Sequence, residues 1–174
     1  MRIILIWIAA AFVFGSFYTM VERKEALRRD GQTVFLALAP ADPRSPMQGD
    51  YMALNYEVMN QLNHEQFDNP NAKVPDSGVL VIQIDNQTVG QFVRLHQNEG
   101  LAPGEHLLKF HRSEHDRIYV IGAETYFIPE GEGPKFAEAK YGELKVEPDG
   151  TPLLVSLCDK DRTPIDTTPV TDSQ

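Results

Sequence analysis

The sequence lacks the residues that several classes of protein require. It holds a single cysteine, Cys158, in 174 residues, which excludes an intramolecular disulfide framework and a zinc site built from several cysteines. It has no surplus of positive charge, because 16 basic and 25 acidic residues give a net charge of −9. This balance argues against a general nucleic-acid-binding protein. Gly-rich phosphate loops, nucleophile elbows and zinc-binding helix motifs are also missing, so we expect no cofactor and no metal ion.

One long stretch lacks charge altogether. Ile3–Val21 is an uncharged and mainly apolar run of 19 residues. As a helix it would extend about 28 Å, close to the thickness of a bilayer's hydrocarbon core. A cleaved signal peptide is the competing interpretation, but the small residues at 9–11 come too early and Gly15-Ser16 makes a weak cleavage site. A helix buried in a globular core is disfavoured, because the run is apolar on every face and lies at the terminus. The sequence therefore predicts an uncleaved transmembrane anchor over residues 1–21.

The charges that flank this run bear on its orientation. Arg23, Lys24, Arg28 and Arg29 follow the run, whereas Arg2 and the α-amino group precede it. By the positive-inside rule, this count places the following domain in the cytoplasm. Residues 22–174 carry 15 basic and all 25 acidic residues, a net charge of −10. That length is sufficient for one domain with a proper core.

Short β-prone runs alternate with turn-forming residues through the rest of the chain. We expect strands at 33–39, 51–58, 79–84, 89–95, 107–111, 118–121, 125–128, 142–147 and 153–157. Helices are expected at 22–29, 59–67 and 134–141. Hairpin turns are predicted at Asp85-Asn86-Gln87 and at Pro148-Asp149-Gly150, because such residues accommodate the backbone of tight turns.

These elements predict a mainly β domain with antiparallel hairpins, built as a small barrel or sandwich with one or two short helices. We assign this domain to residues 22–159 and a disordered tail to residues 160–174, which are rich in Thr, Asp and Pro. In the strand expected at 51–58, alternation places Met52, Leu54, Tyr56 and Val58 on the face toward the core.

A proline-rich segment and the strand that follows it carry a recognisable motif. Residues 39–58 have the sequence APADPRSPMQGDYMALNYEV, in which Gly49, Asp50, Tyr51, Leu54 and Tyr56 match the pattern GDYXXLXY. The segment resembles the GDYXXLXY domain family. Further similar stretches are GAETYFIPEG at 122–131, AKYGEL at 139–144 and the LxxLxD pattern at 154–159, so the resemblance covers about residues 22–160.

The resemblance implies a small bacterial membrane-anchored protein with one N-terminal helix and an externally facing domain. It also implies a multi-pass membrane protein as partner, and it carries no established activity over to this chain. On this basis we expect the cytoplasmic (inner) membrane, with the domain on the periplasmic or exterior side, against the charge count. The expected function is a non-catalytic interaction module.

Two interpretations of the motif loop stay open. In the structural one, Gly49 and Asp50 form a turn that sets the register of the next strand. In the functional one, a proline-stiffened loop recognises a partner. The candidate binding residues are Asp42, Arg44, Gln48, Gly49, Asp50, Tyr51 and Tyr56, with Glu130 and Gly131 as a second motif.

Other functional hypotheses are weaker. Ser45 with Lys109 would suggest a membrane-anchored hydrolase of Ser–Lys type, which requires a desolvated lysine as base. A small-ligand sensor that binds in a β cleft is a further alternative. His106, His111 and His115 lie within ten residues, but their spacing does not place all three on one face of a strand, so we expect surface histidines.

Overall fold

The computed structural model describes residues 2–39, 51–68, 74–114, 117–128 and 132–165. Over these ranges the chain is mainly β, as the sequence predicts. Its helices are α1 (Arg2–Asp30), α2 (Glu57–Asp68) and α3 (Gly133–Phe136). Its strands are β1 (Gln32–Ala37), β2 (Tyr51–Ala53), β3 (Ser77–Ile84), β4 (Gly90–Leu95), β5 (Glu105–Arg112), β6 (Tyr119–Val120), β7 (Thr125–Phe127), β8 (Tyr141–Val146) and β9 (Pro152–Cys158).

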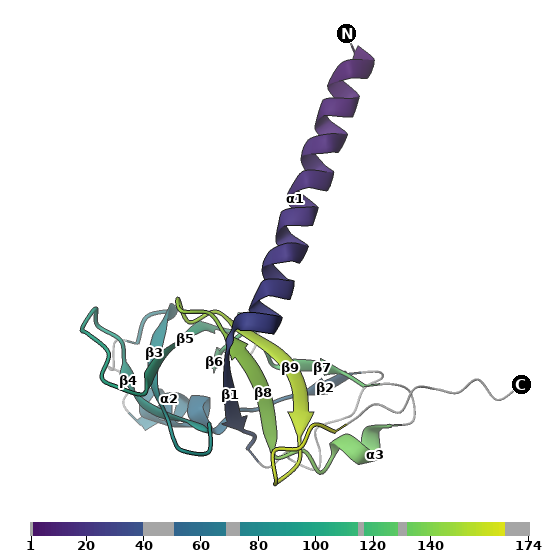
Figure 1. The fold of residues 1–174 in the computed structure, drawn as a ribbon. Coiled ribbons are helices and arrows are strands. Elements are labelled where there is room, and N and C mark those ends of the chain that lie inside the picture. Colours follow the sequence, from purple (N-terminus) through teal and green to yellow (C-terminus); the bar gives the residue numbers. More distant parts are fainter. Residues whose placement is uncertain (1, 40–50, 69–73, 115–116, 129–131, 166–174) are drawn as a thin grey trace, which may run out of the picture.

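The N-terminal helix α1 projects from the β domain, and only its C-terminal end adjoins β8 and β9 (Figure 1). The apolar run and the charged segment 22–30 form one continuous helix. The helix ends at Gly31, whose N–H donates to the Leu27 carbonyl at 2.8 Å. A Cβ atom at Gly31 would lie 2.5 Å from that carbonyl oxygen, so only glycine fits there. Among the residues that the structure describes, no helix combines the length and apolarity needed to cross a membrane.

Three antiparallel sheets build the β domain, with strand orders β1-β8-β9, β2-β7 and β4-β3-β5-β6. Both predicted hairpins are present, β3–β4 and β8–β9. In the first, the Asp85 carboxylate accepts the backbone N–H groups of Gln87 and Val89 at 2.8 and 2.9 Å. In the second, Gly150 has φ +88, a left-handed conformation that favours glycine.

Backbone contacts join the two larger sheets into one curved layer around the core (Figure 1). At one side, the Phe35 N–H of β1 donates to the Thr88 carbonyl at 2.9 Å. At the other, the Lys109 N–H of β5 donates to the Gly150 carbonyl at 2.8 Å. A Cβ at Gly150 would lie 3.1 Å from the backbone of β5, so the absence of a side chain permits this contact.

Helix α2 replaces the second half of the strand predicted at 51–58. The strand prediction is right for Tyr51–Ala53 and wrong from Glu57 onward, whereas the helix predicted at 59–67 is confirmed. The Tyr56 carbonyl accepts the N–H groups of Met59 and Asn60, which begins the helix. Val58, Met59 and Leu62 then bury one face against the core, because their spacing also matches a helix.

The predicted core face is nevertheless correct. Leu54, Tyr56 and Val58 are buried and Met52 is half-buried against the same core. Helix α2 is tied to β6 by Asn63, whose side-chain amide bonds both the N–H and the carbonyl of Tyr119.

Two boundaries near the C-terminus differ from those predicted. Helix α3 has four residues rather than the range 134–141, because the Lys140 N–H donates to the Cys158 carbonyl and the chain enters β8. The described fold also continues past Asp159, where a tight turn leads to an Ile165 N–H that donates to the Leu157 carbonyl at 2.8 Å. Residues 166–174, the rest of the predicted tail, lie outside the described ranges.

Candidate functional site

The motif strand β2 pairs with β7, which belongs to another of the family-like stretches. Tyr51, Met52 and Ala53 pair with Phe127, Tyr126 and Thr125 in antiparallel register. The pairing extends past β2, since the Leu54 N–H donates to the Glu124 carbonyl at 2.7 Å. The described parts of the GDYMALNY and GAETYFIPEG stretches, residues 51–56 and 122–128, therefore form one unit although they lie about 70 residues apart in the sequence.

Tyr56, the last residue of the motif, lies in the core as predicted. Its side chain is 1% exposed, and its hydroxyl donates to the Ala123 carbonyl at 2.7 Å. Burial raises the pKa of this phenol, with a smaller contribution from the charge of Glu124. The hydroxyl therefore keeps its proton and acts as a donor rather than as a nucleophile or base.

The ring of Tyr56 also contacts the third family-like stretch, AKYGEL. A Cβ at Gly142 would lie 3.0 Å from Cε1 of Tyr56 and 3.3 Å from its hydroxyl oxygen. Glycine at this position of β8 thus allows the close approach of the tyrosine ring. Because one buried side chain joins all three stretches, the described part of the motif has a structural role.

Glu124 is a residue of this unit that sequence reasoning missed. Its carboxylate accepts the N–H groups of Ile121 and Gly122 at 2.5 and 3.2 Å. These bonds hold the turn at Gly122, which has φ +81. The turn places the Ala123 carbonyl opposite the Tyr56 hydroxyl. In the sequence, the only local indication of this role is an acidic residue two positions after a glycine.

Most of the predicted binding residues fall outside the described part of the chain. These are Asp42, Arg44, Gln48, Gly49 and Asp50 of the motif loop, and Glu130 and Gly131 of the second motif. Of Tyr51 the structure gives the backbone and its place in β2. Beside it, Phe127 on β7 is 76% exposed, which is unusual for a large aromatic side chain. The loop hypothesis therefore stays a prediction, and an exposed aromatic residue lies on the strand that pairs with β2.

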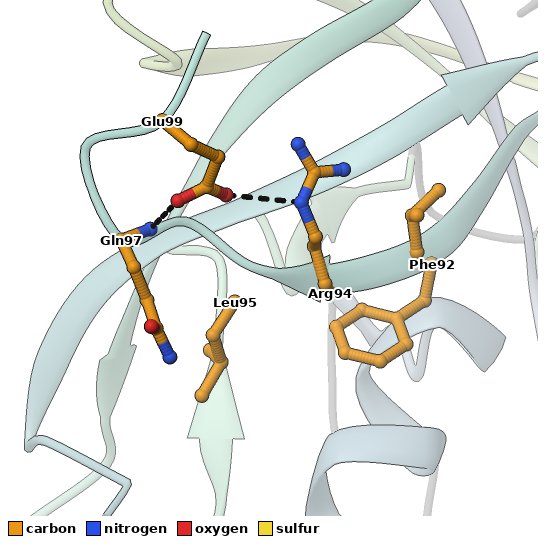
Figure 2. A pocket seen from close by; sticks show the side chains of 6 residues that line it. Phe92, Arg94, Leu95, Gln97 and Glu99 are labelled. Carbon is orange, nitrogen blue, oxygen red and sulfur yellow. Dashed lines mark hydrogen bonds and ion pairs between the residues drawn. The ribbon is translucent and has the colours of Figure 1, made fainter. Parts of the chain in front are cut away.

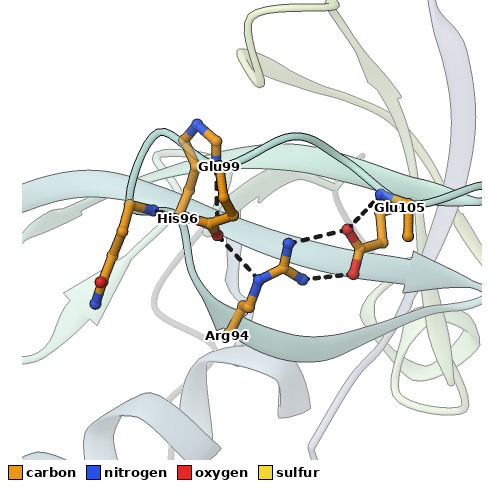
Figure 3. A network of polar contacts seen from close by, with 6 residues as sticks. Arg94, His96, Glu99 and Glu105 are labelled. Atoms are coloured by element: carbon orange, nitrogen blue, oxygen red, sulfur yellow. Dashed lines mark hydrogen bonds and ion pairs between the residues drawn. The ribbon is translucent and has the colours of Figure 1, made fainter.

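A separate pocket of about 430 Å³ lies along β4 and the segment that follows it (Figure 2). It is lined by Phe92, Val93, Arg94, Leu95, Gln97 and Glu99. The guanidinium of Arg94 bonds Glu99 at 2.9 Å, and two of its nitrogens bond the two carboxylate oxygens of Glu105 (Figure 3). Sequence reasoning had not singled out these residues.

The two carboxylates of this network are held in the ionised form. Arg94 lowers the pKa of Glu105, with the backbone N–H of Ala102 as the next cause. For Glu99, backbone N–H groups, its own and that of Gln97, lower the pKa more than Arg94 does. His96 Nδ1 lies 3.8 Å from the same Glu99 oxygen that accepts the bond from Arg94 (Figure 3). Since two carboxylates balance one guanidinium, the charge of Arg94 is neutralised within this pocket.

The hydrolase hypothesis finds no support in the environment of Lys109. Its ammonium group donates to Asp149 at 2.6 Å and to Thr151 at 2.9 Å, and its side chain is 46% exposed. A general-base lysine requires desolvation, and this one is hydrated and ion-paired. Ser45 lies outside the described residues. The partner of Lys109 is affected instead: the ammonium lowers the pKa of Asp149 to about 2.

The histidines bear on a possible metal site. His106 and His111 lie on β5, and His115 is outside the described ranges. Within those ranges, no group of three or more His, Cys, Asp or Glu side chains is placed to hold a metal ion.

Comparison with known proteins agrees with the motif assembly. The sequence profile of a family described as GDYXXLXY protein matches residues 13–157, which is most of the chain. Neither the curated proteins nor the solved structures compared with the chain contain a match. The profile spans all three stretches that Tyr56 brings together. The chain belongs to the GDYXXLXY family.

Proposed function

We propose that this protein is a membrane-anchored, non-catalytic interaction module. Its β domain would lie on the periplasmic or exterior side of the cytoplasmic membrane and act with a multi-pass membrane protein. The observation that carries the proposal is the surface of α1, which leaves large apolar side chains exposed on the helix that projects from the domain (Figure 1). They include Phe12 at 78% and Phe14 at 74% exposed. Apolar surface of this extent requires a cover, and the uncharged run Ile3–Val21 has the length for a bilayer.

We favour a binding role over catalysis because the polar side chains that could act in catalysis already bond other groups of the fold. Tyr56, Arg94 and Lys109 are each engaged in contacts that stabilise the fold. An enzyme of Ser–Lys type would need a lysine released from such pairing. A binding role requires only a surface, and exposed aromatic residues are frequent anchors of protein interfaces.

As the partner-binding residues we propose those of the motif loop together with Phe127. The loop residues Asp42, Arg44 and Asp50 lead directly into β2, and β2 pairs with the strand that carries Phe127. The exposed ring of Phe127 would supply the apolar anchor and the charged residues of the segment 42–50 the polar contacts that are common at interfaces.

Membrane attachment and topology are tested with the full chain. Alkaline carbonate should leave the protein in the membrane fraction. A reporter that is active only outside the cytoplasm, fused after Gln174, should be active. Release by carbonate would refute the anchor. Activity only from a matched cytoplasmic reporter would refute the external domain and agree with the positive-inside count.

The binding surface is tested by co-purification from solubilised membranes. The variant Phe127→Ala and the double variant Arg44→Ala with Asp50→Ala should each lose a partner that the wild type retains. Val93→Ala on β4 is the matched control, since Val93 is also exposed but belongs to a different sheet. Equal recovery of every partner with all variants would refute the assignment of the surface.

A further inference from the structure

A groove of about 340 Å³ lies at the base of α1, where the helix reaches the β domain. Its apolar part is formed by Phe17, Met20 and Val21 of the helix and by Leu153 of β9. The three helical residues follow one another at intervals of three and one, so they share one face of α1. The groove is therefore a continuation of the apolar surface of the helix, closed on one side by a strand.

The opposite end of the same groove is cationic. Among the described residues that line it, Lys24 and Arg28 are basic and Glu25 is acidic. A second arginine nearby, Arg29, does not line the groove and is paired with Asp30 at 3.1 Å. The groove thus holds two cations against one anion, in a protein whose net charge is −9.

The spacing of these cations matches the layers of a bilayer. If the hydrocarbon boundary lies at Val21, the end of the uncharged run, Lys24 lies about 4.5 Å beyond it and Arg28 about 10 Å beyond it. The headgroup layer of a bilayer is roughly 5–8 Å thick on each side. The two side chains therefore reach headgroup phosphates from below and from above.

We infer that this groove binds one anionic phospholipid, with an acyl chain along the apolar part and the phosphate between Lys24 and Arg28. This inference rests on the proposed membrane anchor. The chemistry favours an anionic over a zwitterionic headgroup, because a choline ammonium would meet the two protein cations. Since the protein as a whole is acidic and would be repelled by an anionic surface, the attraction has to be local to the groove.

The experiment measures lipid retained by the full-length protein, solubilised in detergent and examined by native mass spectrometry. Phosphatidylglycerol and phosphatidylcholine with the same acyl chains are the probes. The wild type should prefer phosphatidylglycerol, and the double variant Lys24→Gln with Arg28→Gln should bind it about 30-fold more weakly, from two cations near an anionic headgroup. Exchange of the two residues, Lys24→Arg with Arg28→Lys, keeps both charges and should keep the preference.

The matched control removes the same charge elsewhere. Arg29→Gln with Lys160→Gln changes two cations, one on the same turn of α1 and one on the domain surface, and should change binding less than twofold. The inference is overturned if the wild type binds both lipids equally, or if the control variant loses as much binding as the groove variant. It is also overturned if glycerol phosphate displaces the lipid at equal concentration, because the apolar part would then contribute nothing.

These outcomes are separate from the test of the anchor. A chain that resists carbonate extraction but shows no lipid preference refutes only the lipid site. A chain that carbonate releases refutes the anchor and the lipid site together.

Discussion

Tyr56→Phe tests the contact that unites the family motifs. The substitution keeps the ring that packs over Gly142 and removes one atom, the hydroxyl oxygen that bonds the Ala123 carbonyl at 2.7 Å. The side chain is almost fully buried, so water does not reach the carbonyl to replace the lost donor. The variant therefore isolates the hydrogen bond from the packing of the ring.

The expected cost follows from the burial of both partners. A buried carbonyl left without its donor costs about 1–3 kcal/mol in the free energy of unfolding. The substitution leaves no large cavity, because the aromatic ring remains in place. For a domain of this size, each kcal/mol lowers the melting temperature by roughly 3 °C, so the midpoint should fall by about 3–9 °C.

The single cysteine provides the assay. Cys158 is 0% exposed, so a maleimide fluorophore reacts with it only when the β domain unfolds. The measurement works in detergent with the full chain. Tyr18→Phe is the matched control: it deletes the same oxygen from a tyrosine that bonds Glu22 at 3.0 Å on the exposed surface of α1. It should leave the midpoint within about 1 °C, because this bond lies within α1 and not in the β domain whose unfolding exposes Cys158.

A midpoint unchanged in Tyr56→Phe would refute the reasoning. It would mean that the hydroxyl does not stabilise the Ala123 carbonyl, and the structural role assigned to the motif would lose its main support. Equal shifts in the Tyr56 and Tyr18 variants would count against it as well, since burial would then make no difference.

Two further predictions use the same assay, and a third uses urea titrations followed by circular dichroism, because a protonated thiol does not react with maleimide at low pH. Gly142→Ala should destabilise by about 1–3 kcal/mol, and its effect should be non-additive with Tyr56→Phe because the two residues touch. Gly150→Ala should cost more than about 1 kcal/mol, since it combines φ +88 with a close backbone contact, whereas Gly100→Ala, with nothing within 4 Å, should have little effect. Asp149→Asn should cost about 0.2–1 kcal/mol at pH 7, as expected of an exposed pair. The folded-state pKa of Asp149, about 2, lies below its ordinary value of 3.8. The stabilisation that its carboxylate provides is therefore present above pH 3.8 and is lost as the pH falls toward 2. If urea titrations gave the same difference in the free energy of unfolding between wild type and Asp149→Asn at pH 7 and at pH 2, the ion pair would be contradicted.

The elements that the sequence predicted well are those with local causes. The hairpin turns at Asp85 and Gly150 depend on residues within the turns themselves, and both are present. The helix predicted at 22–29 is present and ends at Asp30, where Gly31, having no side chain, can approach the preceding turn of the helix closely. Each of these features follows from contacts between residues only a few positions apart.

One wrong prediction concerns a segment whose apolar spacing fits both a strand and a helix. Val58 is buried whether the chain there is a strand or a helix, and only the hydrogen bonds of the Tyr56 carbonyl select the helix. Helix α3 stops early because Lys140 bonds β9, a strand nearly 20 residues later in the sequence. A local sequence pattern does not show which distant backbone groups will form hydrogen bonds with a segment, so it does not predict where such an element ends.

By itself, the sequence determined the mainly β class, the hairpins, the burial of Tyr56 and the length of the uncharged run, because composition and short-range spacing are sufficient for these. Only the tertiary structure decided that three family-like stretches meet at Tyr56, that Arg94 is neutralised by two carboxylates, and that Lys24 and Arg28 share a groove with a strand. The physical reason is distance along the chain. A hydrogen bond between Tyr56 and Ala123 spans 67 positions, and no local pattern records which distant backbone group a side chain will find.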